Sequence, residues 1–210
     1  MYASGQVGVG GGVVLGGELF RAFRGFGGGF GHRPVEANGP PCACGSRGCL
    51  EAHAGLEPLL AAAGLDGDKI STAGSGKPVA ELVKRASAGD ATALAALEDC
   101  GRWLGVALGS VVNLLSPQTI VLGGYFAPIS DWLRPAIERE VAARLLDGVE
   151  YGRAKGLHQL AGVDRADALD HPGAEITLDA LQRGWRAVLR KAALNCSPWV
   201  ASFSQMPDAW

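Results

Sequence analysis

The chain has 210 residues, of which 48% are hydrophobic and 19% charged, and its formal net charge is −2. This is the composition of a globular protein; it excludes a disordered polyelectrolyte and provides no chain-wide charge for holding nucleic acid or an anionic membrane. No run reaches the roughly 20 apolar residues of a membrane helix, and the first residues lack the basic stretch and apolar core of a signal peptide. We therefore expect a cytoplasmic protein without a membrane segment.

The first 50 residues are rich in glycine. Residues 6–14 are β-prone, and Gly16-Gly17 gives a two-residue turn before Glu18, which predicts a β-hairpin. Residues 24–49 have no hydrophobic periodicity and contain many Gly, Pro and Asn residues, which predicts a long loop. A loop of this length in a compact domain is usually functional or held by an additional constraint.

Residues 50–115 carry helical signals. Residues 50–63 predict one or two short helices with a restart at Pro58, and residues 78–86 predict a further short helix after a polar loop at 66–77. The strongest signal covers residues 90–115. Its apolar stripe runs at three- and four-residue steps and includes Leu94, Leu97, Gly101, Leu104, Leu108, Val111 and Leu115. Glycines 105 and 109 cost helix propensity, so we expect another backbone to pack closely against them.

The next segment predicts an α/β unit. Residues 119–122 form a short apolar run typical of a buried strand, Gly123-Gly124 follows as a turn, and a helix is expected over 128–146. Residues 150–175 have no pattern that assigns them to an element. A last amphipathic helix is predicted over 176–194.

Four side chains in the long loop have the chemistry of a structural zinc site. They are His32, Cys42, Cys44 and Cys49. Three thiolates and one imidazole complete a tetrahedral Zn²⁺ shell and leave no open position, which is typical of a structural rather than a hydrolytic site. The alternative is a group of free thiols, which would oxidise readily if exposed. Cys100 and Cys196 lie on or near predicted helices, where a cysteine is usually a small buried apolar residue.

Three sequence strings together resemble the ROK family of repressors, open reading frames and sugar kinases. They are VGVGGGVVLGGELFRAFRGFGGGFGH, NGPPCACGSRGCLEAHAG and NLLSPQTIVLGGYFAP. They follow the family's order over residues 5–146, about two thirds of the chain, and the CxCGxxGCxE pattern is the most distinctive. The third string looks most like ROK transcriptional regulators of high-GC Gram-positive bacteria.

The resemblance implies an α/β protein with the actin-like, ribonuclease H-like ATPase fold. This chain would be the C-terminal lobe, over residues 1–150, with an inserted zinc loop at 24–50. Residues 151–210 would be a divergent tail with one amphipathic helix, since the family's closing helix is not recognisable beyond about residue 155; a shifted reading frame is the alternative. The family also forms homodimers, which we expect here.

The resemblance transfers ligand roles to individual residues. The His of the family's Glu-x-Gly-His motif binds zinc and helps to hold the sugar, and the Glu after the last cysteine contacts sugar hydroxyls. These positions are His32 and Glu51 here. The family's glycines near the nucleotide phosphates and the adenosine, expected to be vestigial in this chain, fall on Gly10, Gly11, Gly12, Gly123 and Gly124.

The departures from the family pattern bear on function. Gly29 replaces the first Glu of Glu-x-Gly-His, which removes an acceptor for sugar hydroxyls and predicts weak or lost sugar binding. The family's Asp-x-Gly-Gly-Thr phosphate motif and its Asn-Asp pair, which holds the catalytic base, are expected before Met1, as is the helix-turn-helix of the repressors. No catalytic residue is therefore assigned to this chain.

These features favour a fragment of a transcriptional regulator, a sugar-sensing effector lobe that holds Zn²⁺ without catalysing a reaction or contacting DNA itself. The alternative is a glucokinase-like sugar kinase that uses ATP and Mg²⁺ to phosphorylate a hexose and lacks its N-terminal lobe here. A third hypothesis is a zinc-stabilised dimerisation module, in which the glycines of helix 90–115 pack against a second copy.

Overall fold

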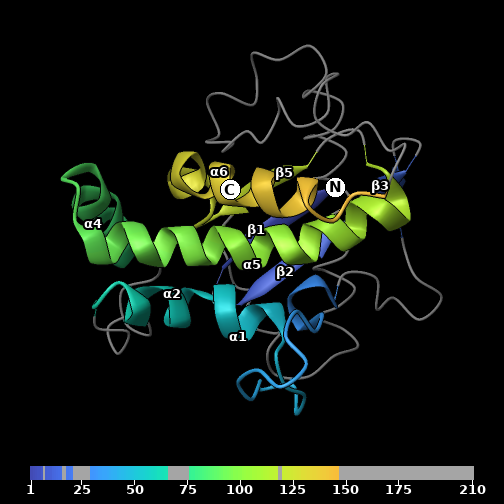
Figure 1. Cartoon of the computed structure of the whole chain (residues 1–210), viewed down its shortest axis with the longest axis horizontal. Coiled ribbons are helices and arrows are strands. Elements are labelled where there is room, and N and C mark those ends of the chain that lie inside the picture. Colours follow the sequence, from blue (N-terminus) through green and yellow to red (C-terminus); the bar gives the residue numbers. More distant parts are fainter. Residues whose placement is uncertain (7, 16–17, 21–28, 66–75, 118–119, 147–210) are drawn as a thin grey trace, which may run out of the picture. The chain divides into compact units, whose positions relative to one another are not determined.

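The computed structural model describes residues 1–6, 8–15, 18–20, 29–65, 76–117 and 120–146 (Figure 1). Several predicted segments lie outside these residues. They are residues 66–75 of the polar loop predicted at 66–77, the irregular segment at 150–175, and the tail at 151–210 with its helix predicted over 176–194. The chain divides into two units, one of Met1–Gly11 with Gly28–Asp164 and one of Gly12–Gly27 with Arg165–Trp210.

A three-stranded sheet has β1 (Tyr2–Gly5) at its centre, between β2 (Val9–Gly12) and β5 (Val121–Gly124). Strands β1 and β5 are parallel, with Tyr2 opposite Val121 and Gly5 opposite Gly124. A parallel pair requires a crossover connection, which the helices between the two strands supply. The predicted mixed α/β fold is therefore confirmed.

The paired glycines of β5 occupy a different structure from the one predicted. Both Gly123 and Gly124 belong to the strand and pair with β1, so the predicted turn at these residues is wrong. Gly124 has a φ of 62°, and a Cβ there would overlap the carbonyl oxygen of Gly5. A Cβ at Gly123 would overlap the Tyr2 hydroxyl, so tight strand contacts account for both glycines.

The glycines at positions 10–12 lie in strand β2, within the stretch of residues 6–14 that the sequence indicates to be β-prone. The predicted hairpin follows as β3 (Val14–Leu15) and β4 (Glu18–Leu19), which pair antiparallel with Val14 opposite Leu19. The hairpin prediction is confirmed.

The helices begin close to where the sequence pattern predicts them. They are α1 (Leu50–Ala54), α2 (Leu56–Ala62), α4 (Gly76–Ser87), α5 (Ala91–Leu115) and α6 (Ser130–Ala142). A short 3-10 turn, η3 (Ala127–Ile129), leads into α6. The break between α1 and α2 falls at Gly55 and not at Pro58, because Gly55 has an extended backbone and Pro58 fits the first turn of α2.

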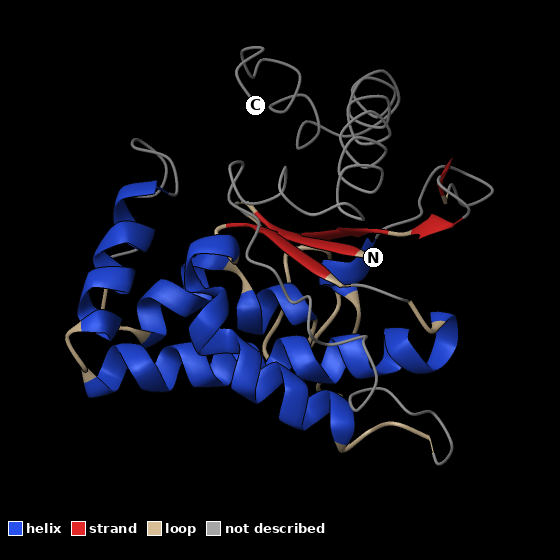
Figure 2. Cartoon of the chain, turned by 90° about the horizontal axis from the view of Figure 1, so that it is seen from above, coloured by secondary structure: helices blue, strands red, loops and turns tan. Residues whose placement is uncertain are grey.

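Helix α5 is the central helix of the first unit and packs against α1, α2, α4 and α6 (Figure 1). The Asp90 side chain accepts a hydrogen bond of 2.9 Å from the backbone N–H of Ala93 and caps the helix start. The predicted apolar stripe is buried from Leu97 to Val111, whereas Leu94 and Leu115 at its two ends are exposed. The helical layer lies on one side of the three-stranded sheet (Figure 2).

The glycines of α5 pack against α6. A Cβ at Gly101 would lie 2.7 Å from the Leu133 carbonyl oxygen, and a Cβ at Gly105 would lie 2.5 Å from Glu140 Cβ and 3.0 Å from the Ile137 carbonyl oxygen. The predicted close backbone approach is thus confirmed at Gly105, where the backbone that approaches is α6. At Gly109 a Cβ would lie nearest to the Arg144 side chain, at 3.2 Å, and 3.8 Å from Val141 Cα, so the close approach predicted there is not found. None of the described helices combines the length and the apolarity needed to cross a membrane.

Candidate metal centre

The loop between η1 (Gly29–His32) and α1 folds back on itself so that its two arms meet. The backbone N–H of Val35 donates to the Gly48 carbonyl at 2.7 Å, and that of Leu50 donates to the Arg33 carbonyl at 2.9 Å. Gly48 has a φ of 64°, and a Cβ there would overlap the carbonyl oxygen of Glu36. A glycine at this position therefore lets the arms close.

A tight turn reverses the chain direction just after Cys42. The backbone N–H of Cys42 donates to the Ser46 carbonyl at 2.8 Å, and that of Gly45 donates to the Cys42 carbonyl at 3.0 Å. Gly45 adopts a φ of 88°, a conformation that other L-residues rarely reach. The chain can therefore reverse between Cys42 and Cys49.

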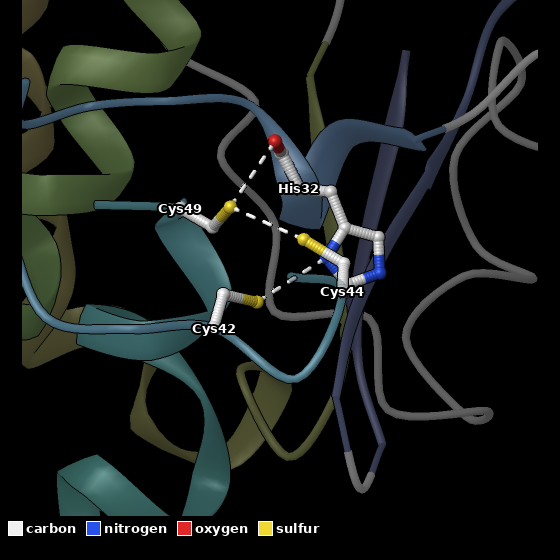
Figure 3. A group of neighbouring side chains, drawn as sticks. All are labelled: His32, Cys42, Cys44 and Cys49. Carbon is white, nitrogen blue, oxygen red and sulfur yellow. Dashed lines mark hydrogen bonds between the residues drawn. The ribbon is translucent and has the colours of Figure 1, made fainter. Parts of the chain in front are cut away.

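The four predicted metal ligands come together at the junction of the arms (Figure 3). The ligand atoms of His32, Cys42, Cys44 and Cys49 all lie within 4.8 Å of one another. The Sγ atoms of Cys44 and Cys49 are 3.7 Å apart, and Cys42 Sγ lies 3.6 Å from His32 Nδ1. A tetrahedral zinc site has ligand sulfurs about 3.8 Å apart and a sulfur and a nitrogen about 3.6 Å apart. The donor set and its spacing therefore fit a metal ion of this kind.

The cysteines of the group differ in their environments. Hydrogen bonding, first of all from the backbone of Ser46, lowers the pKa of the exposed Cys44 thiol. Burial raises the pKa of Cys49 to about 12, and its thiol lies 3.4 Å from the His32 carbonyl oxygen, to which it donates. A metal ion entering the group has to displace the Cys49 proton, since the thiolate is the form that binds metals.

Glu51, predicted to contact a sugar, makes a contact that the sequence does not indicate. Its Oε2 accepts a hydrogen bond of 2.9 Å from the backbone N–H of Val9 in β2. Gly8 lies directly beneath this carboxylate, because a Cβ at Gly8 would overlap Oε2. The carboxylate therefore links α1 to the start of the glycine-rich strand.

We call residues 29–51, which contain the four candidate metal ligands, the metal loop. A second cluster of side chains joins the metal loop and the start of α1 to α5, and the sequence does not predict it. The imidazole of His53 stacks on the indole of Trp103, and its Nε2 lies 3.2 Å from Glu36 Oε2 without the alignment of a hydrogen bond. The Arg102 guanidinium lies over the Trp103 ring at 4.0 Å and pairs with Asp99. Glu36 and His53 are far in the sequence from Arg102 and Trp103, so spacing provides no signal that these two parts of the chain meet.

The remaining candidate residues lie apart from the metal ligands. Cys100 is buried in α5, as expected for a small apolar residue. A Cβ at Gly29 or Gly10 would meet no described atom within 4 Å, whereas one at Gly11 would lie 2.8 Å from Phe30 Cβ. Cys196 lies outside the described residues.

The profile of the ROK family matches residues 2–164 of the chain. The chain belongs to the ROK family. The resemblance inferred from the three sequence strings is therefore confirmed.

The relatives of this chain include repressors and sugar kinases. The xylose repressor of Bacillus spizizenii is 32% identical over 145 residues, which are 69% of this chain and 36% of the repressor. The glucokinase of Halalkalibacterium halodurans is 34% identical over 175 residues, 74% of this chain and 51% of the kinase.

The fold of this ROK chain is shared with solved members of the family. A ROK glucokinase from Streptomyces griseus, determined with glucose and AMPPNP, superposes with a TM-score of 0.60 at 24% sequence identity. The match covers 73% of this chain and 53% of the glucokinase chain. The fold is that of ROK sugar kinases and repressors, and the chain spans about a third to a half of the length of the two curated relatives.

Proposed function

We propose that this ROK chain is a sugar-sensing effector lobe of the regulator type, held together by a structural Zn²⁺ ion. The observation that carries the proposal is the group formed by His32, Cys42, Cys44 and Cys49, followed two positions later by Glu51, whose Oε1 accepts no hydrogen bond from the described residues. We further propose that the lobe is the C-terminal half of an actin-like ATPase fold. The repressors among the relatives support the regulator assignment, and the kinases among them support the alternative.

Zinc in this site would be held by the three thiolates and the imidazole, and its role would be structural. A closed shell leaves no position for water or substrate, so the bound ion supplies loop stability and not Lewis-acid chemistry. Backbone hydrogen bonds already join the arms of the loop, and a metal ion would add a link between the side chains of its two ends. The metal would therefore fix η1 and the start of α1 relative to each other.

The proposed sugar site lies beside this metal group. His32 is exposed and directs Nδ1 toward Cys42, while its other ring nitrogen points away from the sulfurs (Figure 3). A sugar hydroxyl can pair with that nitrogen and with the carboxylate of Glu51. Gly29, at the start of η1, offers no side-chain acceptor, and a Cβ there would meet no described atom within 4 Å, so we expect weak sugar binding.

Gly29 is also the reason to favour a sensor over a kinase. Phosphoryl transfer requires the sugar to be held in line with the phosphate, and a missing acceptor loosens that alignment. A homodimer remains part of the proposal, but the glycines of α5 cannot form its interface while α6 packs on them. The hypothesis of a dimerisation module built on those glycines loses its structural support.

Calorimetry tests this function on the full chain loaded with zinc. D-Glucose, D-xylose and N-acetyl-D-glucosamine are titrated separately, and a coupled assay measures ATP turnover with each sugar. We expect millimolar binding of at least one sugar and no turnover above the background. Turnover would establish the kinase alternative, and the absence of heat with all three sugars would remove the sensor function.

A further inference from the structure

The backbone of Val9 is held from both sides by the two ends of the metal loop. On one side, its N–H donates to Glu51 Oε2 at 2.9 Å. On the other, the η1 backbone packs so tightly that a Cβ at Gly31 would overlap the Val9 carbonyl oxygen. Val9 itself is 7% exposed, and its hydrogen bond to Glu51 is partly buried.

Both contacts on Val9 come from immediate neighbours of the metal ligands. Gly31 precedes His32, and Glu51 follows Cys49 by two positions. Fixing these ligands therefore also fixes the two groups that hold the first residue of β2. Strand β2 is bonded to β1, which in turn pairs with β5, so a shift at Val9 reaches the centre of the sheet.

The Glu51 carboxylate has capacity for two partners. Oε2 is used by Val9, whereas Oε1 has no hydrogen-bond donor among the described residues. A carboxylate that already accepts one N–H loses less side-chain freedom when a hydroxyl binds to its second oxygen. The same argument runs in reverse, because a hydroxyl on Oε1 holds Oε2 in place for Val9.

We propose that Glu51 transmits sugar occupancy to the sheet through its hydrogen bond from the Val9 N–H. The inference rests on the proposed sugar binding and adds the route by which binding is sensed. Glu51 then acts both as a sugar ligand and as a positioning residue for β2. Thermodynamic linkage makes the effect reciprocal. If sugar binding strengthens the hydrogen bond between Val9 and Glu51 by a given factor, loss of that hydrogen bond weakens sugar affinity by the same factor.

Gly8 offers a way to break the Val9 bond without changing Glu51. A Cβ at Gly8 would overlap Oε2, so Gly8→Ala displaces the carboxylate while its charge is retained. Glu51→Gln makes the complementary change, because the amide oxygen still accepts from Val9 but the negative charge facing the sugar is lost. Gly76→Ala is the matched control, since a Cβ at Gly76 meets no described atom within 4 Å.

The experiment measures amide hydrogen exchange at Val9 by NMR in the full zinc-loaded chain. It uses whichever of D-glucose, D-xylose and N-acetyl-D-glucosamine binds most tightly in calorimetry. We expect sugar to slow exchange of the Val9 N–H by about fivefold or more, the lower end of common coupling strengths. Gly8→Ala should abolish this slowing and weaken sugar binding by a similar factor, Glu51→Gln should keep the Val9 N–H protected, and Gly76→Ala should match the wild type.

Two outcomes overturn the inference, and they differ from failure of the proposed function. If the wild-type chain binds sugar but exchange at Val9 does not change, the coupling is absent although the sensor function stands. If Gly8→Ala retains stoichiometric zinc and binds sugar as the wild type does, the route through Val9 is also excluded. If none of the three sugars binds to the wild-type chain, the proposed function fails and the coupling fails with it. The wild-type measurement decides the question even if the Gly8→Ala chain does not fold.

Discussion

The imidazole of His53 stacks on the indole of Trp103, with ring centroids 4.0 Å apart and ring planes inclined by 28°. His53 belongs to α1, directly after the metal loop, and Trp103 belongs to α5. The Glu36 carboxylate, from the loop itself, lies 3.2 Å from His53 Nε2. The stack therefore connects the metal loop to the central helix of the fold.

This stack predicts a pH-dependent stability. Burial is the largest effect on His53 and lowers its pKa from 6.5. The charges of Glu36 and Asp99 raise the pKa by less, and the charge of Arg102 lowers it. Between the folded-state pKa and about 6.5 the unfolded chain binds more protons, so the free energy of unfolding falls as the pH drops through that window. Urea unfolding from pH 7.5 to 5 should show this loss.

His53→Phe is the control for the pH dependence, because a phenyl ring can stack on Trp103 but cannot titrate. Zinc release on acidification affects both proteins alike, so the difference between their pH profiles isolates His53. We expect a flatter profile for His53→Phe. Parallel profiles for the two proteins would show that His53 does not contribute to the pH dependence.

Metal removal should destabilise the chain. A chelator is expected to lower the unfolding temperature of the zinc-loaded protein, because the loop ends lose the ion that joins them. Cys49→Ser should lose stoichiometric zinc in elemental analysis, whereas Cys100→Ala should retain it, since Cys100 is buried in α5 apart from the ligands. Full zinc content in Cys49→Ser would argue against this ligand set.

Zinc affinity should rise with pH. Burial raises the pKa of Cys49 to about 12 in the metal-free chain, so zinc must release a proton when it binds this sulfur. Lower pH supplies the competing protons, and the affinity decreases accordingly. Competition with a chromophoric chelator between pH 6 and 8 measures the slope; an affinity independent of pH would be inconsistent with thiolate ligation.

Gly29→Glu should strengthen sugar binding. A Cβ at position 29 meets no described atom within 4 Å, so a side chain can be accommodated there. The new carboxylate supplies a charged acceptor for sugar hydroxyls, and we expect affinity to increase by about tenfold. Gly29→Ala adds the Cβ without the acceptor and should bind as the wild type does. Equal affinities for the Glu and Ala variants would place the sugar elsewhere.

The packing of α5 on α6 predicts that substituting Gly105 lowers the free energy of unfolding, whereas substituting Gly109 does not. Gly105→Ala forces a Cβ against Glu140 and the Ile137 backbone, and we expect a net loss of about 1–2 kcal/mol in chemical unfolding. In Gly109→Ala the new Cβ would lie 3.2 Å from Arg144, a side chain beyond the end of α6, and 3.8 Å from Val141 Cα, which is ordinary van der Waals contact. Its helix-propensity gain should offset that contact. Similar effects at both positions would contradict this helix interface.

The clustering of the four candidate metal ligands could be predicted from the sequence because its signal is local. Cys42, Cys44 and Cys49 lie within a short loop, and their residue types limit the chemistry they can share. The helix over 91–115 was equally accessible, because burial of one face imposes a period that the sequence displays. In both cases the physical constraint acts between residues that are close in the sequence.

The contacts that join distant parts of the chain could not be predicted in this way. Val9 and Glu51 are 42 positions apart, His53 and Trp103 are 50 apart, and Glu36 and His53 are 17 apart. The strand glycines were misassigned for a related reason. Gly123 and Gly124 are required by the approach of β1, and a glycine pair looks the same in sequence whether it serves a turn or a tight strand contact.

The parallel pairing of β1 with β5 has a consequence for how the chain is made. Tyr2 is synthesised 119 residues before its partner Val121. Until then one edge of β1 has no neighbour, and an open edge of this kind can recruit other chains. Long-range pairing also slows folding. Nascent chains of this protein should therefore depend on protection from aggregation until β5 has emerged and can pair with β1.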